Sequence, residues 1–89
     1  MKLEDYPKYS DVFYIGGTKC GLLFGEALVI INEELRKSQF IRITKQKGAT
    51  LAKGRLLGVQ FVELFKGDNY YQVGKHSNEM AMKLKKAFL

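Results

Sequence analysis

The feature that most constrains the fold of this sequence is an alternating apolar pattern between Leu56 and Val73. Successive side chains of a strand point to opposite faces of the sheet. One face would carry Leu57, Val59, Phe61, Glu63 and Phe65, and the other Gly58, Gln60, Val62 and Leu64. The turn formers of Lys66–Asn69 separate this run from Tyr70–Val73. The pattern therefore predicts a β-hairpin.

Two further segments are typical of strands. Val12–Ile15 is β-branched and aromatic, and it ends at the pair Gly16-Gly17. Phe40–Thr44 alternates, with Ile41 and Ile43 on one face, as in a half-buried strand.

The segment 21–31 has several interpretations. Gly25-Glu26 divides it into two apolar runs, which fits either a hairpin turning there or one bulged strand. A helix over 26–37 is the rival, because Glu33–Lys37 contains good helix formers. The β-branched run Val29–Ile31 favours a strand followed by a turn.

The last residues, from about 77 to 88, are predicted to form a helix. Ser77 can cap its first turn, and lysines near its end suit the helix dipole. Its apolar stripe consists of Met80, Leu84, Ala87 and Phe88. We expect this stripe to pack on the sheet.

A chain of 89 residues has room for a single core. We expect a polar lead-in over 1–11 and one domain over 12–89. The predicted class is α+β, a bent antiparallel sheet or partly open barrel of about five to seven short strands, closed by one C-terminal helix. No apolar run reaches the roughly 20 residues of a membrane span. The start lacks the apolar core of a signal peptide, so we expect a cytoplasmic protein.

Charge is distributed unevenly along the chain. The net charge is +6, and no acid occurs between Glu34 and Glu63. The intervening basic residues are Arg36, Lys37, Arg42, Lys45, Lys47, Lys53 and Arg55. They form a candidate anion-binding region. The same pattern also fits a solvated surface that keeps a small protein dissolved.

No set of residues with catalytic spacing stands out. His76 is the single histidine and Cys20 the single cysteine, and nothing in the sequence places them together. Gly16–Lys19 lacks the spacing of a phosphate-binding loop. We therefore expect no catalytic residues, no metal site, no cofactor and no enzymatic activity.

The sequence resembles two families. The likeness to small bacterial pleckstrin-homology-like domains, as encoded beside mannose-class phosphotransferase permeases, includes Lys19–Gly21, Phe24–Ala27, Phe40–Ile43 and Val59–Phe61. It implies a non-catalytic regulatory or scaffolding role. Arg55–Leu64 is similar to a strand of PilZ domains, which bind cyclic dinucleotides, but the paired arginines that clamp phosphates there are absent.

These observations together predict a non-catalytic binding or regulatory domain that acts through a protein partner, with an anionic partner as one variant. The alternative is nucleic-acid binding through the basic region 36–55. An anionic membrane surface and a homodimer are also left open by the sequence.

Overall fold

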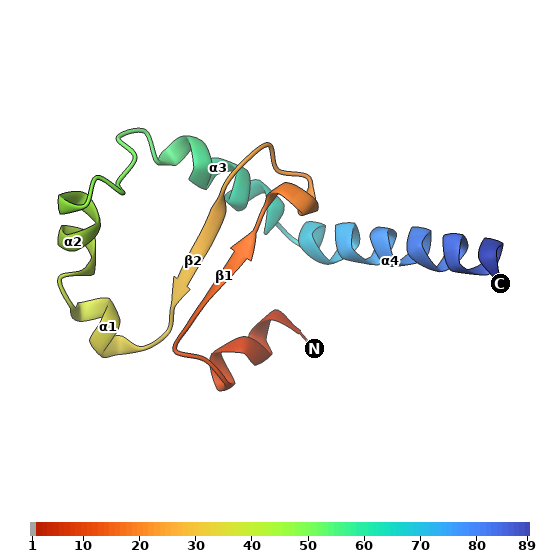
Figure 1. Ribbon diagram of the computed structural model, residues 1–89, viewed down its shortest axis with the longest axis horizontal. Coiled ribbons are helices and arrows are strands. Elements are labelled where there is room, and N and C mark those ends of the chain that lie inside the picture. Colours follow the sequence, from red (N-terminus) through yellow and green to blue (C-terminus); the bar gives the residue numbers. More distant parts are fainter. Residues whose placement is uncertain (1) are drawn as a thin grey trace.

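The computed structural model describes residues 2–89, and most of its regular structure is helical (Figure 1). Within this range the elements, in chain order, are η1 (Leu3–Lys8), β1 (Val12–Gly16), η2 (Thr18–Cys20), β2 (Glu26–Ile30), α1 (Glu33–Lys37), α2 (Phe40–Gln46), α3 (Arg55–Leu64) and α4 (Asn69–Phe88), where η marks a 3₁₀ helix. The expected β-rich sheet or barrel of five to seven strands closed by one helix is therefore wrong.

The two strands form one antiparallel hairpin. Val12 pairs with Ile30 and Gly16 with Glu26. The predicted strand at 12–15 is confirmed as β1, and the predicted strand before residue 32 is confirmed as β2. The rival helix over 26–37 forms only in its second half, as α1, where Asn32 caps it by accepting a hydrogen bond from the Leu35 backbone N–H at 3.1 Å.

The predicted hairpin over 56–73 is wrong, because residues 55–64 form the helix α3 and Tyr70–Val73 form the first turn of α4. The apolar run satisfies the helical period as well as the strand period. Leu57, Phe61 and Leu64, at spacings of four and three residues, lie on the less exposed face of α3. Leu57 and Phe61 lie against Gly25 in the connection between β1 and β2, and this contact favours the helix over the strand.

The predicted strand at 40–44 is also wrong, since these residues lie in α2. Among the described residues no strand pairs with this segment, and the sheet consists of β1 and β2 alone. A helix satisfies the backbone N–H and C=O groups within the segment itself, which an unpaired strand cannot do. Ile41 is left 78% exposed on this helix.

The C-terminal helix is confirmed, but it begins at Asn69 rather than Ser77. Ser77 is not a cap; its hydroxyl donates to the Val73 carbonyl oxygen at 3.0 Å in the helix interior. The expectation that Met80, Leu84, Ala87 and Phe88 pack on the sheet is wrong. All four are exposed, because this part of α4 projects away from the hairpin (Figure 1).

The lead-in contains the 3₁₀ helix η1 although Pro7 lies inside it. The hydrogen bonds that close it, Asp5 N–H to the Lys2 carbonyl and Tyr9 N–H to the Tyr6 carbonyl, do not need the N–H that proline lacks. The carboxylate of Asp5 also accepts from the backbone N–H of Lys2 at 2.8 Å and the ammonium of Lys8 at 2.9 Å. These hydrogen bonds lower the pKa of Asp5.

The chain buries little of itself. Among the described residues, Leu64 alone forms a buried hydrophobic core position. The accessible surface is 7850 Å², whereas a folded monomer of 10.2 kDa exposes about 5,300 Å². The radius of gyration is 16.5 Å, compared with about 12 Å for a compact domain of this length. The shape is therefore open, 52 Å in its longest dimension.

Candidate functional site

The connection between β1 and β2, residues 17–25, is closed by several backbone hydrogen bonds. Gly17 N–H donates to the Gly25 carbonyl at 3.1 Å, and the N–H groups of Cys20 and Leu22 both donate to the Gly17 carbonyl, at 2.9 and 3.1 Å. A Cβ added at Gly17 would lie 2.5 Å from Cδ1 of Leu22. The buried Gly17 therefore allows the chain to fold back closely on itself. We call residues 17–25 the clamped turn.

A side-chain amide of α3 holds the clamped turn from outside. The Oε1 atom of Gln60 accepts from the Leu23 backbone N–H at 3.0 Å, and its Nε2 atom donates to the Phe24 carbonyl at 3.2 Å. One glutamine thus satisfies a backbone donor and a backbone acceptor in a segment that forms no ladder. This pairing fixes the turn against α3.

Gly25 completes the contact between the turn and α3. Its φ angle is +102°, a conformation that side chains with a Cβ rarely adopt. An added Cβ would also lie 2.7 Å from Cδ2 of Leu57. The glycine that the sequence suggested as a hairpin turn or a bulge is therefore the point at which α3 approaches the backbone.

A row of aromatic rings connects α3 to α4. The ring centroids of Phe61 and Phe65 are 6.3 Å apart, those of Phe65 and Tyr70 5.0 Å, and those of Tyr70 and Tyr71 5.6 Å. Partial burial raises the pKa of the Tyr70 phenol, with smaller contributions from Cys20, Tyr6 and Tyr71. The row leads from the base of the clamped turn to an open cavity.

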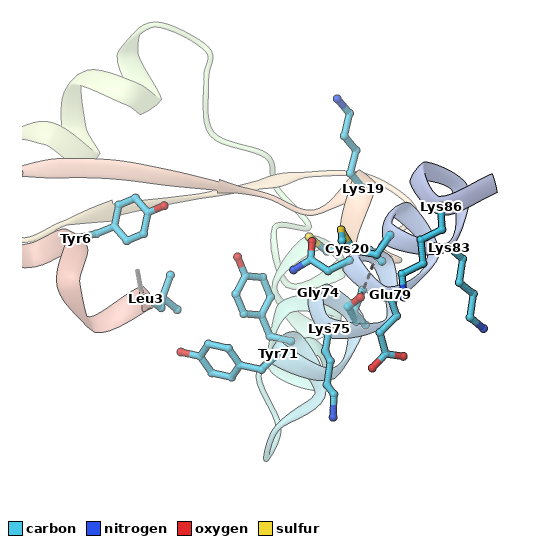
Figure 2. Close-up of a pocket in the computed structure, with 15 residues that line it drawn as sticks. Leu3, Tyr6, Lys19, Cys20, Tyr71, Gly74, Lys75, Glu79, Lys83 and Lys86 are labelled. Atoms are coloured by element: carbon cyan, nitrogen blue, oxygen red, sulfur yellow. Dashed lines mark hydrogen bonds between the residues drawn. The ribbon is translucent and has the colours of Figure 1, made fainter. Parts of the chain in front are cut away.

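This cavity of about 970 Å³ lies between η1, the clamped turn and α4 (Figure 2). Tyrosines from two parts of the chain, Tyr6 and Tyr71, line it together with Lys19 and Cys20 of the turn. The remaining cations of its lining, Lys75, Lys83 and Lys86, come from α4. Figure 2 shows the Lys19 side chain extending away from the tyrosine rings.

The predicted anion-binding residues lie elsewhere. Arg36, Lys37, Arg42, Lys45, Lys47, Lys53 and Arg55 follow the arc from α1 through α2 to the start of α3 (Figure 1). None of them lines the cavity. Arg36 and Lys37 contact Glu33 at 4.0 and 2.7 Å, which offsets part of the positive charge.

Nucleic-acid binding by this arc stays a prediction. A salt titration with random DNA and RNA tests it, because binding through phosphates weakens steeply as salt rises. Absence of binding at low salt would remove it.

Sequence reasoning missed the cavity lysines and the role of Gln60. Lys19 lies in the glycine-rich segment Gly16–Gly21, and glycines are typical of turns. This segment is the sequence feature that could have indicated Lys19. Gln60 carried no such signal, since its partners lie 36 and 37 residues away. Cys20 is half-buried beside Lys19, whereas His76 lies exposed on α4.

Two classes of site are not found in the part of the chain that the structure describes. No three histidine, cysteine or acidic side chains gather there as metal ligands would. No helix between residues 2 and 89 combines the length and apolar character needed to cross a membrane.

Comparison with known proteins gives one clear similarity. A protein of Pseudomonas aeruginosa described as low specificity L-threonine aldolase is 34% identical over 71 residues, which are 80% of this chain and 20% of that enzyme. The chain thus spans about a fifth of the length of the curated relative it matches. No family model matches the chain, and no solved structure does. The similarity is to an enzyme and lends no support to the expected lack of catalysis.

Proposed function

We propose that this chain is one part of an aldolase-type enzyme acting on L-threonine, and that further polypeptide covers its apolar surfaces. The similarity over 71 residues to an L-threonine aldolase supports the activity. The accessible surface of 7850 Å², about half as large again as that of a compact protein of equal mass, supports the covering polypeptide. A catalytic pocket needs walls that exclude water. Here the cavity is open, so the missing walls must come from other polypeptide.

The hairpin supports the same proposal. Tyr14 and Leu28 lie opposite each other in the β1–β2 register, and they are 70% and 52% exposed. A two-stranded hairpin is marginal in water unless other elements cover a face. The outer face of this hairpin is therefore suited to burial against a larger sheet or helix layer. In this proposal the expected protein partner is the polypeptide that supplies that layer.

Lys19 is the candidate catalytic residue within the proposal. An aldol cleavage releases a carbonyl compound, and lysine amines form Schiff bases with carbonyl compounds. Lys19 is the lysine of the cavity that a hydrogen-bonded turn positions, whereas Lys75, Lys83 and Lys86 lie on the exposed helix α4. A nucleophile on a fixed turn is better oriented than one on a projecting helix.

A chimera tests the proposed activity. The matched 71 residues of the Pseudomonas aeruginosa enzyme are replaced with the corresponding residues of this chain, and cleavage of L-threonine is measured. We expect cleavage by the chimera and none by the 89-residue chain alone. A folded chimera, with the secondary structure and oligomeric state of the parent, that does not cleave L-threonine would refute the proposal.

Substitutions in the same chimera test Lys19. Lys19→Ala and Lys19→Arg should both lower kcat by at least about 10³-fold, because arginine keeps the charge but cannot act as the amine nucleophile. Lys83→Ala, which removes another lysine of the cavity lining, should retain activity within about tenfold. Activity of the Lys19→Arg chimera near that of the unsubstituted chimera would show that Lys19 is not the nucleophile.

A further inference from the structure

Most of α4, from Gly74 to Phe88, is exposed: one of its faces lines the open cavity, and the opposite face lies against no other element. Every residue in this range is exposed, and the helix projects alone from the rest of the chain (Figure 1). A single helix of about this length is marginal in water without a packed face. Its stability must therefore come from something that covers it.

The spacing of its residues fits a second helix. Apolar or small residues recur along α4 at alternating intervals of three and four, at positions 70, 73, 77, 80, 84 and 87. This is the repeat of a helix–helix seam. The seam includes Met80, 39% exposed, and Leu84, 61% exposed. Ser77 interrupts its apolar character, which suits a seam between helices better than insertion among lipid chains.

The side chains that flank this seam indicate the charge of the partner. On one side lie His76 and Lys83, and on the other lie the uncharged residues Gly74, Ala81 and Phe88. Lys75, Lys85 and Lys86 add further positive charge to the helix, and Glu79 is its one acid. Two copies of α4 packed antiparallel would place Lys83 beside His76 or Lys83 of the other copy, and two copies packed parallel would leave Lys83 beside uncharged residues, so neither arrangement supplies an opposite charge. An acidic partner would be attracted instead.

We propose that the outer part of the α4 seam, formed by Met80, Leu84 and Ala87, docks an acidic amphipathic helix of another polypeptide segment. Tyr70 and Val73, at the start of the seam, are half-buried and line the cavity. The inference names the partner that the proposed function leaves open, since that function also requires covering polypeptide. The partner lays its apolar face along Met80 and Leu84 and places acidic side chains beside Lys83.

Peptide binding tests the inference on the 89-residue chain. The probe is a synthetic peptide of about four heptads with leucine at the seam positions and glutamate at the flanking positions. Calorimetry measures its affinity, and circular dichroism measures the gain in helix. We expect binding with added helix, and binding at least about tenfold weaker for Leu84→Glu. Met82→Glu is the control, because Met82 lies on the opposite face of α4 and is also exposed, at 52%.

Each remaining outcome overturns the inference. If a peptide with lysine in place of glutamate bound with equal affinity, the partner would not be recognised by its negative charge. If Leu84→Glu and Met82→Glu lowered the affinity equally, the peptide would not bind along the seam. Self-association of the chain that Leu84→Glu abolishes, with no peptide binding, would assign the seam to a second copy. Binding only to vesicles containing anionic lipid would assign it to a membrane.

Leu84 and Met82 are both exposed, at 61% and 52%, although Met82 lines the open cavity. Neither substitution should therefore unfold the rest of the chain, and circular dichroism checks this. The two proposals can fail separately. An inactive folded chimera refutes the proposed aldolase activity but does not affect the proposed helix docking. Failure of peptide binding refutes the docking but leaves the chimera result unchanged.

Discussion

The hairpin with α3 and the outer half of α4 use similar residues in opposite ways. Leu57 and Phe61 of α3 lie against Gly25 of the clamped turn, Leu64 of the same helix is buried, and Gln60 pairs with the turn backbone. Met80 and Leu84 of α4 have the same apolar character and face solvent. Similar residues at helical spacing thus form a local core in one region and an unpartnered seam in the other. The difference lies in whether a second element is present to receive them.

A leucine-to-alanine substitution should have the most different effects on stability in α3 and in the outer half of α4. Leu64 is 7% exposed and Leu84 is 61% exposed. Leu64→Ala should lower the free energy of unfolding by about 2–5 kcal/mol, because it empties a buried position. Leu84→Ala should change it by less than about 0.5 kcal/mol. Urea unfolding followed by circular dichroism measures both. Equal losses would mean that α4 is packed in solution.

Alanine substitutions at Gly25, in the clamped turn, and at Gly58, in α3, should change the free energy of unfolding in opposite directions. Gly25→Ala should destabilise the chain by about 1–3 kcal/mol, because the positive φ and the contact with Leu57 both oppose a Cβ. Gly58→Ala, on the open side of α3 with nothing within 4 Å of the added carbon, should stabilise by about 0.4–1 kcal/mol. The same urea titration applies. A stabilising Gly25→Ala would show that the turn is not held against α3.

Gln60 gives a smaller and more specific effect. Gln60→Ala removes both hydrogen bonds to the clamped turn and should cost about 0.5–1.5 kcal/mol for each bond lost. Gln72→Ala, at an exposed position of α4, is the matched control and should be nearly neutral. Amide hydrogen exchange gives the sharper measurement, since the Leu23 amide should exchange faster in Gln60→Ala alone. An unchanged Leu23 amide would argue against the pairing.

The smallest effect concerns pH. Because partial burial raises the pKa of Tyr70, the folded chain holds this proton more tightly than the unfolded chain. The associated stability is present below the ordinary tyrosine pKa of about 10, and it is lost as the pH rises through the folded value. Ultraviolet titration should show a late-ionising phenol that Tyr70→Phe removes. Tyr9→Phe, which removes an 84% exposed ring, should leave that late component in place.

Local sequence patterns predicted correctly those elements whose residues fit either the strand period or the helical period, but not both. Val12–Ile15 is β-branched and aromatic, and it forms β1; the stripe from Met80 to Phe88 fits a helix, and it lies in α4. The run at 56–65 fits both periods, so the sequence could not decide, and the strand interpretation was wrong. The candidate site depended on still longer-range contacts. Lys19 and Tyr71 line one cavity although 52 residues separate them, and no local pattern indicates that pairing.

The amino-acid sequence alone determined the short-range preferences: the turn at Gly16-Gly17, the β-branched strand, the helical stripe and the unequal distribution of charge. Only the tertiary structure decided that α3 is a helix, that Gln60 holds the clamped turn, and that the stripe of α4 faces solvent. The physical reason is that intrinsic preferences differ by only about 1 kcal/mol per residue. The presence or absence of a packing partner is worth several times as much.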